Sequence, residues 1–254
     1  MRCLVYCVLR DGEFPASCLP QGLNGDAVSL VGEGGLAAAF SPVPDSHAEP
    51  SLPRAMAFAR VVEAFHQRCT ALPLRYGCVV EGEPQVAALL RERRAQFLAS
   101  LGEIEGCVEM SLRVLLPDAA RPQPDAPANA SAGRAYLTRR IAHYAAEERR
   151  ELEAEAAAES IRSRFAGLHE RSHAERGAKP LTHTVHFLVR RGRVEAFRAA
   201  FGRLQAESAA KVMLSGPWPP YNFAACEEPS DRVIGPQIIG SSPDCGAASI
   251  EAAQ

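Results

Sequence analysis

The distribution of apolar residues over the first 45 positions predicts strands. The run Cys3–Leu9 is continuously apolar and rich in β-prone side chains, a pattern typical of a buried strand. Two further apolar runs, Val28–Val31 and Leu36–Phe40, flank the glycine-rich stretch 32–35. Glycine supplies the positive φ angles that a tight turn needs. We therefore expect a buried strand followed by a β-hairpin.

The period of the apolar residues then changes to three and four, which predicts two helices. The first runs from Arg54 to Leu72 and ends before Pro73. The second follows a short apolar segment at 78–80, starts with Pro84 in its first turn and reaches Leu101. The residues expected on the buried faces are Phe58, Val61, Val62, Phe65, Cys69 and Leu72 in the first helix, and Val86, Leu89, Leu90, Phe97 and Leu101 in the second.

A period of two returns from Val108 to Leu116, where apolar residues alternate with Glu109, Ser111 and Arg113. This pattern predicts a strand with one buried face. We expect it to complete an N-terminal mixed α/β domain, residues 1–116. Residues 117–130 contain four prolines and no apolar period, which favours an extended linker.

A long charged helix is expected from about Ser131 to Leu168. At 1.5 Å per residue it would span roughly 50 Å, more than the width of a small domain, so it should protrude or bridge. Its mixed charge run at 147–155 is best interpreted as a solvated face rather than a docking surface. The interrupted apolar stripe consists of Leu137, Ile141, Tyr144, Leu152, Ile161 and Phe165.

The rest of a C-terminal domain, residues 131–223, follows the long helix. The pattern predicts a strand at Thr184–Val189, a helix at Val194–Leu204 and a short strand at 212–214. Residues 224–254 are rich in Gly, Pro, Ser and Ala, so ordering them would cost more entropy than burial could offset. We expect this tail to be mostly disordered.

Composition and charge exclude several classes of protein. The chain has 254 residues, of which 47% are hydrophobic, enough for one or two small cores. A net charge of -2 gives no electrostatic case for nucleic acid or an anionic membrane as partner. No apolar stretch reaches the roughly 18 residues of a membrane span, and the N-terminal run is too short for a signal peptide. We expect a cytoplasmic protein.

Residues that could carry chemistry are better explained as structural. The eight cysteines are scattered without a CxxC pair, and most lie beside apolar patterns. His183 and His186 would point to opposite faces of a strand, so they are not a metal pair. Cys69 lies three residues after His66 but belongs to the apolar face of its helix, which favours packing over a nucleophilic role. Gly32, Gly34 and Gly35 lack the Lys-Ser/Thr pair of a phosphate-binding loop.

Two strings are unusual enough to need a separate explanation. LPLRYG, at Leu72–Gly77, places one arginine at the predicted exit of a helix. LSGPWPPYNF, at Leu214–Phe223, combines three prolines with the only tryptophan. Such a segment either caps a core or presents a rigid binding surface, and both interpretations stay open.

These strings, together with GGLAA at 34–38, SPV at 41–43 and GRAYLTRR at 133–140, resemble the gas vesicle accessory family of proteins L and F (GvpL/GvpF). The resemblance covers about residues 2–223. It implies an α+β protein of two small α/β domains, the N-terminal one ferredoxin-like and the C-terminal one with a long helix and a ferredoxin-like sheet. The many cysteines and the long polar tail are departures from the family pattern.

The resemblance also implies a function. It implies an accessory or minor structural role in gas vesicle assembly, contact with the shell protein GvpA and other accessory proteins, and a location in the cytoplasm with gas vesicles. It implies no catalysis, no cofactor and no metal. The candidate interaction or motif residues are Arg75, Gly77, Arg134, Tyr136, Gly216, Pro217, Trp218, Pro219, Pro220 and Tyr221.

Among these, Trp218, Tyr221 and Arg75 are hypothesised to contribute to apolar surfaces that hold unassembled shell protein. One alternative is a small-molecule-binding or regulatory α/β module, which a convergent polar pocket would favour. Another is a thiol-dependent enzyme, which would need an accessible low-pKa cysteine near His66.

Overall fold

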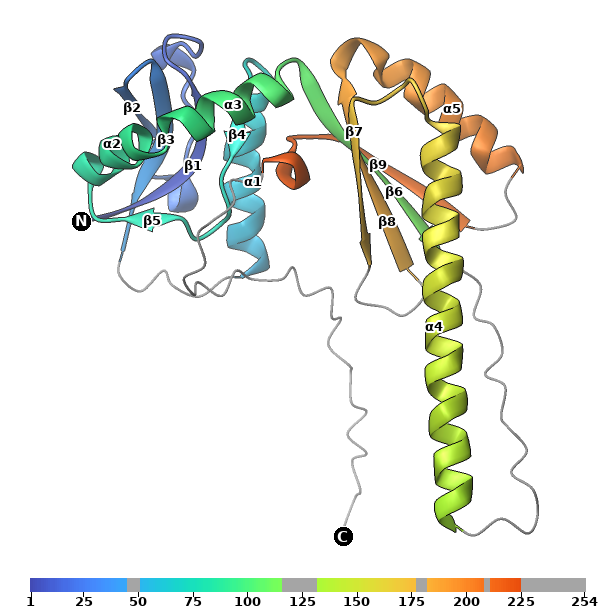
Figure 1. The fold of residues 1–254 in the computed structure, drawn as a ribbon. Helices are drawn as coiled ribbons and strands as arrows, with labels where there is room; N and C mark the ends of the chain where they lie inside the picture. Colours follow the sequence, from blue (N-terminus) through green and yellow to red (C-terminus); the bar gives the residue numbers. More distant parts are fainter. Residues whose placement is uncertain (45–50, 116–131, 177–181, 208–210, 225–254) are drawn as a thin grey trace, which may run out of the picture.

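The computed structural model describes residues 1–44, 51–115, 132–176, 182–207 and 211–224. It contains two antiparallel sheets, each with its own helices (Figure 1), which confirms the α+β class. The predicted linker at 117–130 and, apart from Ala224, the predicted disordered tail at 224–254 lie outside the described residues.

The first sheet is built around the N-terminal strand. Its strands are β1 (Arg2–Arg10), β2 (Ser29–Glu33), β3 (Leu36–Val43) and the two short strands β4 (Leu72–Pro73) and β5 (Val79–Val80). Their order is β2-β3-β1-β4, and β5 also pairs with β1. Gly34 and Gly35 have φ angles of 60° and 82° at the turn between β2 and β3, which confirms the predicted hairpin.

Helices cover both faces of this sheet. On one side, α1 (Leu52–His66) packs on Leu4, Tyr6 and other β1 side chains. On the other, α2 (Glu83–Glu92) and α3 (Arg94–Ile104) pack on Cys3, Val5 and their neighbours. Since helices cover both faces, β1 reads as a continuous apolar run rather than an alternating one.

Two predicted helix boundaries are wrong. The first helix ends at His66 rather than Leu72, because Leu72 instead pairs with Val8 of β1 as part of β4. The predicted second helix is two helices that meet at Arg93, whose φ of -104° and ψ of 17° interrupt the helical path. The apolar period continues through this break, so the sequence pattern could not show that there are two helices.

The second sheet contains β6 (Cys107–Leu115), β7 (Arg171–Arg176), β8 (Thr182–Arg190) and β9 (Lys211–Trp218), in the order β7-β8-β6-β9. With α4 (Ala132–Arg164) after β6 and α5 (Val194–Glu207) after β8, the elements follow the β-α-β-β-α-β order of a ferredoxin-like unit. The ferredoxin-like sheet expected in the C-terminal half is therefore present.

Membership of β6 differs from the prediction. The sequence analysis placed this strand in the N-terminal domain, but it pairs along its whole length with β8 and forms the centre of the second sheet. The strand β7 was not predicted, because its sequence RSHAER has no apolar alternation. β7 is an edge strand, so only one neighbouring strand, β8, forms backbone hydrogen bonds with it.

Only the C-terminal end of α4 packs on the second sheet. Ala158, Ile161 and Phe165 are buried there, and Phe165 contacts Phe187 and Phe197 at ring-centroid distances of 5.5 and 4.4 Å. The N-terminal half extends beyond both sheets (Figure 1), as its predicted length suggested. Four residues of the predicted stripe are exposed, Leu137, Ile141 and Tyr144 in this half and Leu152 just beyond it.

The two units share a core. Cys107, Leu188 and Phe223 lie in one buried cluster with side chains of the first sheet. Arg171 of β7 pairs with Glu103 of α3 at 2.5 Å. Short 3₁₀ helices occupy the connections, η1 (Ala16–Cys18), η2 (Leu23–Gly25), η4 (Arg191–Arg193) and η5 (Tyr221–Phe223). Within the described ranges, no helix is both long and apolar enough to span a membrane.

Candidate functional site

The second sheet has one face free of helices. α4 and α5 cover one side, while the other turns toward the first unit (Figure 1). Side chains on this helix-free face come from residues that pair directly across the four strands. They form three rows, each with one residue from β7, β8, β6 and β9 in that order. The first row is Arg171, Leu188, Glu109 and Trp218. The second is His173, His186, Ser111 and Ser215, and the third is Glu175, Thr184, Arg113 and Met213.

A buried hydrogen-bond network occupies the middle of this face. Glu109 and His186 are 4% and 8% exposed, and Glu109 Oε1 lies 3.0 Å from His186 Nδ1. Ser111 Oγ lies 2.8 Å from the same nitrogen, while Nε2 faces Glu175 Oε2 at 3.4 Å. A buried carboxylate is costly unless hydrogen bonds satisfy it. The network therefore fixes the side chains at the centre of the face.

The same network holds the end of the LSGPWPPYNF segment. The Asn222 backbone N–H donates to Glu109 Oε2 at 2.9 Å, and its amide Nδ2 donates to Glu109 Oε1 at 2.6 Å. The next residue, Phe223, is buried in the cluster shared with the first sheet, and the Arg171 guanidinium lies 5.8 Å from its ring centroid. This segment therefore connects the two units.

Gly216 lets the segment approach β6 closely. Its φ is 112°, and a Cβ there would lie 2.6 Å from the Glu109 carbonyl oxygen, a distance that no side chain tolerates. The Gly216-Pro217 peptide bond is cis. Pro219 and Pro220 are buried. Here the prolines cap a core, as one of the two open interpretations proposed.

The same segment also presents side chains to solvent, as the other interpretation proposed. Trp218 is 46% exposed at the end of β9, and Met213 on the same edge strand is 52% exposed. Tyr221 is 39% exposed, yet burial of its hydroxyl raises its pKa well above the ordinary value, with further contributions from nearby Cys7 and Glu63. An exposed aromatic beside a fixed backbone has little entropy to lose on binding.

The other candidate residues lie elsewhere. Exposed Arg75 and Gly77 form the loop between β4 and β5, where Gly77 has a φ of 96°. Arg134 and Tyr136 are exposed near the free end of α4. The structure therefore distributes the predicted residues over three places, and it gathers only residues 216–221 at the junction of the two units.

Burial explains the cysteines and His66. Cys3, Cys7 and Cys107 are buried free thiols whose pKa burial raises. For the pair considered as a nucleophile, burial raises the pKa of Cys69 to about 11 and lowers that of His66 to about 4. A thiol with so high a pKa carries almost no thiolate at neutral pH, so the pair contributes packing. Cys226 and Cys245 lie outside the described residues.

The described residues contain no group of three or more His, Cys, Asp or Glu side chains placed to hold a metal ion. His183 pairs with Val114 and His186 with Ser111, on opposite faces of the sheet, as the strand period predicted.

The network of Glu109, Ser111, His186 and Asn222 was missed by the sequence analysis. Glu109 and Ser111 were identified only as the polar positions of an alternating strand, and a one-sided strand normally turns such positions to solvent. Asn222 was part of the proline-rich segment but carried no signal of its own. Their contact joins residues 77 and 113 positions apart in the chain, which no local pattern reveals.

Comparisons with known proteins agree with this architecture. The chain is 28% identical over 250 residues to gas vesicle protein L of Streptomyces sp. (strain CB03234), covering 88% of this chain and 93% of the relative. It is 27% identical over 244 residues to gas vesicle protein F of the same organism, covering 88% and 99%.

Solved structures show the same fold. The crystal structure of GvpF from Anabaena sp. PCC7120 superposes with a TM-score of 0.73 at 18% identity, covering 91% of this chain and 99% of the other. The crystal structure of GvpF from Microcystis aeruginosa superposes with a TM-score of 0.72 at 15% identity, covering 88% of this chain and 99% of the other. The family model described as gas vesicle synthesis protein GvpL/GvpF matches residues 2–225. The chain therefore belongs to the GvpL/GvpF family of gas vesicle synthesis proteins.

Proposed function

We propose that this protein acts in gas vesicle assembly by binding the shell protein GvpA, together with other accessory proteins, through the edge strand β9 of its second sheet. Membership of the family supports the assembly role. The observation that carries the finer proposal is the exposed pair Met213 and Trp218 on β9, beside the fixed segment 219–223.

This surface suits a partner with an apolar face. Gas vesicle subunits have to present apolar surface to the gas phase, and such surface aggregates in water before assembly. Trp218 and Met213 offer exposed apolar area, and Arg113 adds an exposed cation in the row that contains Met213. Tryptophan and arginine are among the residues that binding hot spots favour.

The protein is proposed to act without catalysis, in the cytoplasm and in contact with forming vesicles. The raised pKa of Cys69 and the lowered pKa of His66 support this, because neither group is poised to react near neutral pH. The Glu109 network does not favour the small-molecule alternative. Both carboxylate oxygens of Glu109 and both ring nitrogens of His186 already have partners within the chain, so these two buried groups are not arranged to hold a ligand.

The test is a pull-down of the tagged protein with co-expressed GvpA. We expect specific retention by the wild type and a loss of about tenfold or more in affinity for Trp218→Ala, as for a typical hot-spot aromatic. Met56→Ala is the control, because Met56 is an apolar side chain on α1 that is 56% exposed, more than Trp218, and this variant should retain GvpA normally.

Each outcome has a separate meaning. Retention that survives Trp218→Ala would remove this residue from the binding surface. A wild-type protein that retains no GvpA would shift the role to contact with other accessory proteins, which the same pull-down can test with each accessory protein in turn.

A further inference from the structure

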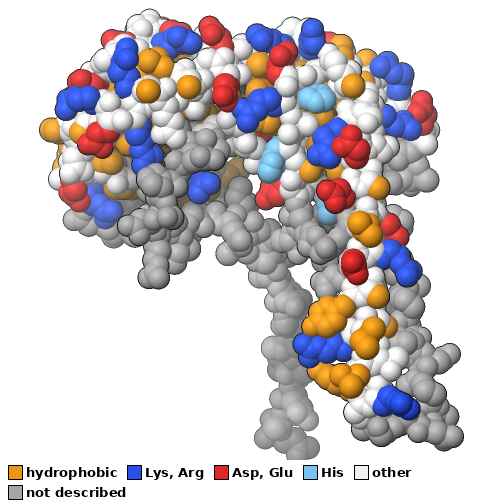
Figure 2. All heavy atoms as spheres, in the orientation of Figure 1, with side chains coloured by type: hydrophobic (Ala, Val, Ile, Leu, Met, Phe, Trp, Pro, Cys, Tyr) orange, Lys and Arg blue, Asp and Glu red, His pale blue; other side chains and the backbone are white. Residues whose placement is uncertain are grey.

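The free half of α4, continued to Leu152, carries large apolar side chains that the described residues leave uncovered. Leu137, Ile141 and Leu152 are 58%, 67% and 65% exposed, and Tyr144 is 52% exposed. At about 100° per residue, the four lie within roughly 80° of one another around the helix axis, with exposed Glu148 in the same arc between Tyr144 and Leu152. Figure 2 shows hydrophobic and basic side chains together on this part of the helix.

Charge is also divided along α4. Residues 132–144 contain three arginines and no acidic residue, whereas residues 147–159 contain six glutamates and two arginines. The dipole of a helix favours the reverse order, with acidic residues at its N-terminal end. The basic N-terminal end of α4, which has no acidic residue in its first turn, therefore opposes the dipole, and an antiparallel neighbour with the same order would bring glutamates against it.

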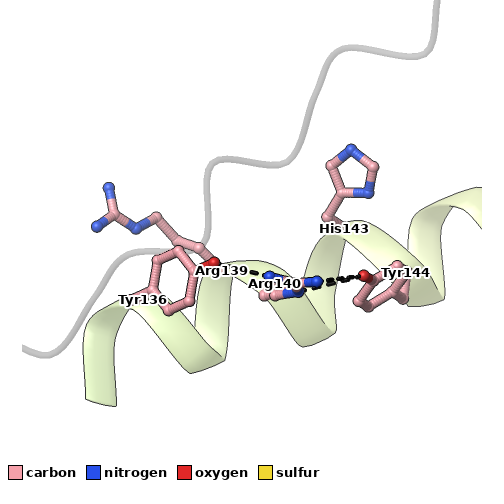
Figure 3. Close-up of a pocket in the computed structure, with 5 residues that line it drawn as sticks. All are labelled: Tyr136, Arg139, Arg140, His143 and Tyr144. Atoms are coloured by element: carbon pink, nitrogen blue, oxygen red, sulfur yellow. Dashed lines mark hydrogen bonds between the residues drawn. The ribbon is translucent and has the colours of Figure 1, made fainter. Parts of the chain in front are cut away.

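Side chains beside the apolar face are already held in place. Arg140 Nη1 donates to the Tyr136 hydroxyl at 2.8 Å, and its Nε and Nη2 donate to the Tyr144 hydroxyl at 3.2 and 3.0 Å (Figure 3). The guanidinium carbon also lies 5.6 Å from the Tyr144 ring centroid. A surface ordered in this way loses less side-chain entropy when a partner covers it.

We propose that α4 pairs with the α4 of a second copy of this chain, antiparallel and centred between residues 146 and 147. This register places Ile141 of one copy opposite Leu152 of the other, and the basic segment 132–144 opposite residues 149–161, which hold four of the six glutamates. Such contacts occur twice about a two-fold axis, the usual symmetry of a homodimer. The overlap of residues 134–159 is about 39 Å long.

Two observations favour a second copy over an unrelated helix. Both complementary segments lie in one helix, so the chain carries its own partner for charge and for apolar surface. The free half also projects clear of both sheets (Figure 1), so the antiparallel arrangement puts the globular parts of the two copies at opposite ends of the pair. This dimer is independent of the proposed binding of shell protein.

The test is sedimentation equilibrium of the full chain. We expect the wild type to reach twice the 27.3 kDa of one chain as concentration rises. Ile141→Glu alone and Leu152→Arg alone each place a charge against an apolar residue twice per dimer, so each should raise the dissociation constant about tenfold or more. An equimolar mixture of the two variants should recover association, because one Glu–Arg contact and one unchanged Ile–Leu contact then form.

Ala146→Glu is the matched control, since it introduces the same residue on the far side of the helix and outside both charged segments, and it should leave the dissociation constant within about twofold. Far-UV circular dichroism checks that all variants fold. A wild type that stays monomeric at every concentration overturns the proposal, and so does a mixture that associates no better than its components.

Discussion

His66 illustrates what burial does to a single residue. The side chain is 5% exposed at the end of α1, and neither ring nitrogen has a hydrogen-bond partner in the structure. Its backbone carbonyl accepts a hydrogen bond from the Arg191 guanidinium, which ties the first unit to the second. Burial, with a smaller contribution from the charge of Arg191, lowers the pKa of the ring to about 4.

The lowered pKa predicts a stability that depends on pH. The folded protein binds a proton at His66 more weakly than the unfolded chain, whose pKa is about 6.5. Neutral His66 therefore stabilises the fold fully above pH 6.5, and this stabilisation is lost as the pH falls toward 4. At pH 5 the loss in the free energy of unfolding is about 2 kcal/mol. For His66→Leu, the free energy of unfolding measured in urea should not show this loss between pH 7 and pH 5. His173→Leu, at an exposed site, should keep it, and an equal loss in both variants would contradict the assignment.

Among the elements, β6 makes buried contacts on both of its faces, with different partners on each. Its apolar positions face α4 and α5, while Glu109 and Ser111 on the other face bind His186 and the Asn222 end of η5. In a sheet covered on one side only, this second face would be turned to solvent. Because β6 is central and η5 folds over it, the polar side chains are buried and must satisfy one another.

Removing Glu109 should therefore release η5. Glu109→Ala leaves the two Asn222 donors and the buried His186 without their acceptor, which should cost about 2 kcal/mol in the free energy of unfolding. Hydrogen exchange should rise at residues 221–223. Glu175→Ala is the control, because this carboxylate is 62% exposed at 3.4 Å from His186 and its loss should cost less than about 0.5 kcal/mol. Equal costs for the two variants would show that the network does not hold η5.

The whole molecule depends on contacts that join the two units. Phe223 is 5% exposed in a cluster with side chains of β1, β3, α2, α3 and β8, although it belongs to the segment that follows the second sheet. Arg171 and Glu103 add a 2.5 Å ion pair across the same junction. Both units therefore lose part of a core if this junction opens, so they should unfold together.

Calorimetry tests this coupling. The wild type should unfold in a single transition, whereas Phe223→Ala should lower the free energy of unfolding by about 3–5 kcal/mol and separate the transitions of the two units. Trp218→Ala removes a half-exposed aromatic nearby and should cost about 1 kcal/mol or less. A Phe223→Ala variant that melts like the wild type would mean that the units are not coupled through η5.

Local pattern alone predicted much of this fold. The apolar run of β1, the glycine turn between β2 and β3, the buried faces of the helices and the length of α4 all depend on residues within a few positions of one another. Side-chain period and turn chemistry are short-range properties, so one sequence displays them. The strings LPLRYG and LSGPWPPYNF likewise indicated the family before any contact was visible.

Long-range pairing determined the remainder. The pattern of β6 gives its buried face but not its partners, and strand pairing assigned it to the second sheet. The apolar stripe of α4 looks uniform in sequence, but the sheet is shorter than the helix, so Ile161 is buried and Ile141 is not. Glu109 meets Asn222 across 113 residues. Such contacts form only when distant segments pack together, because their free energy comes from shared burial and not from neighbours in the chain.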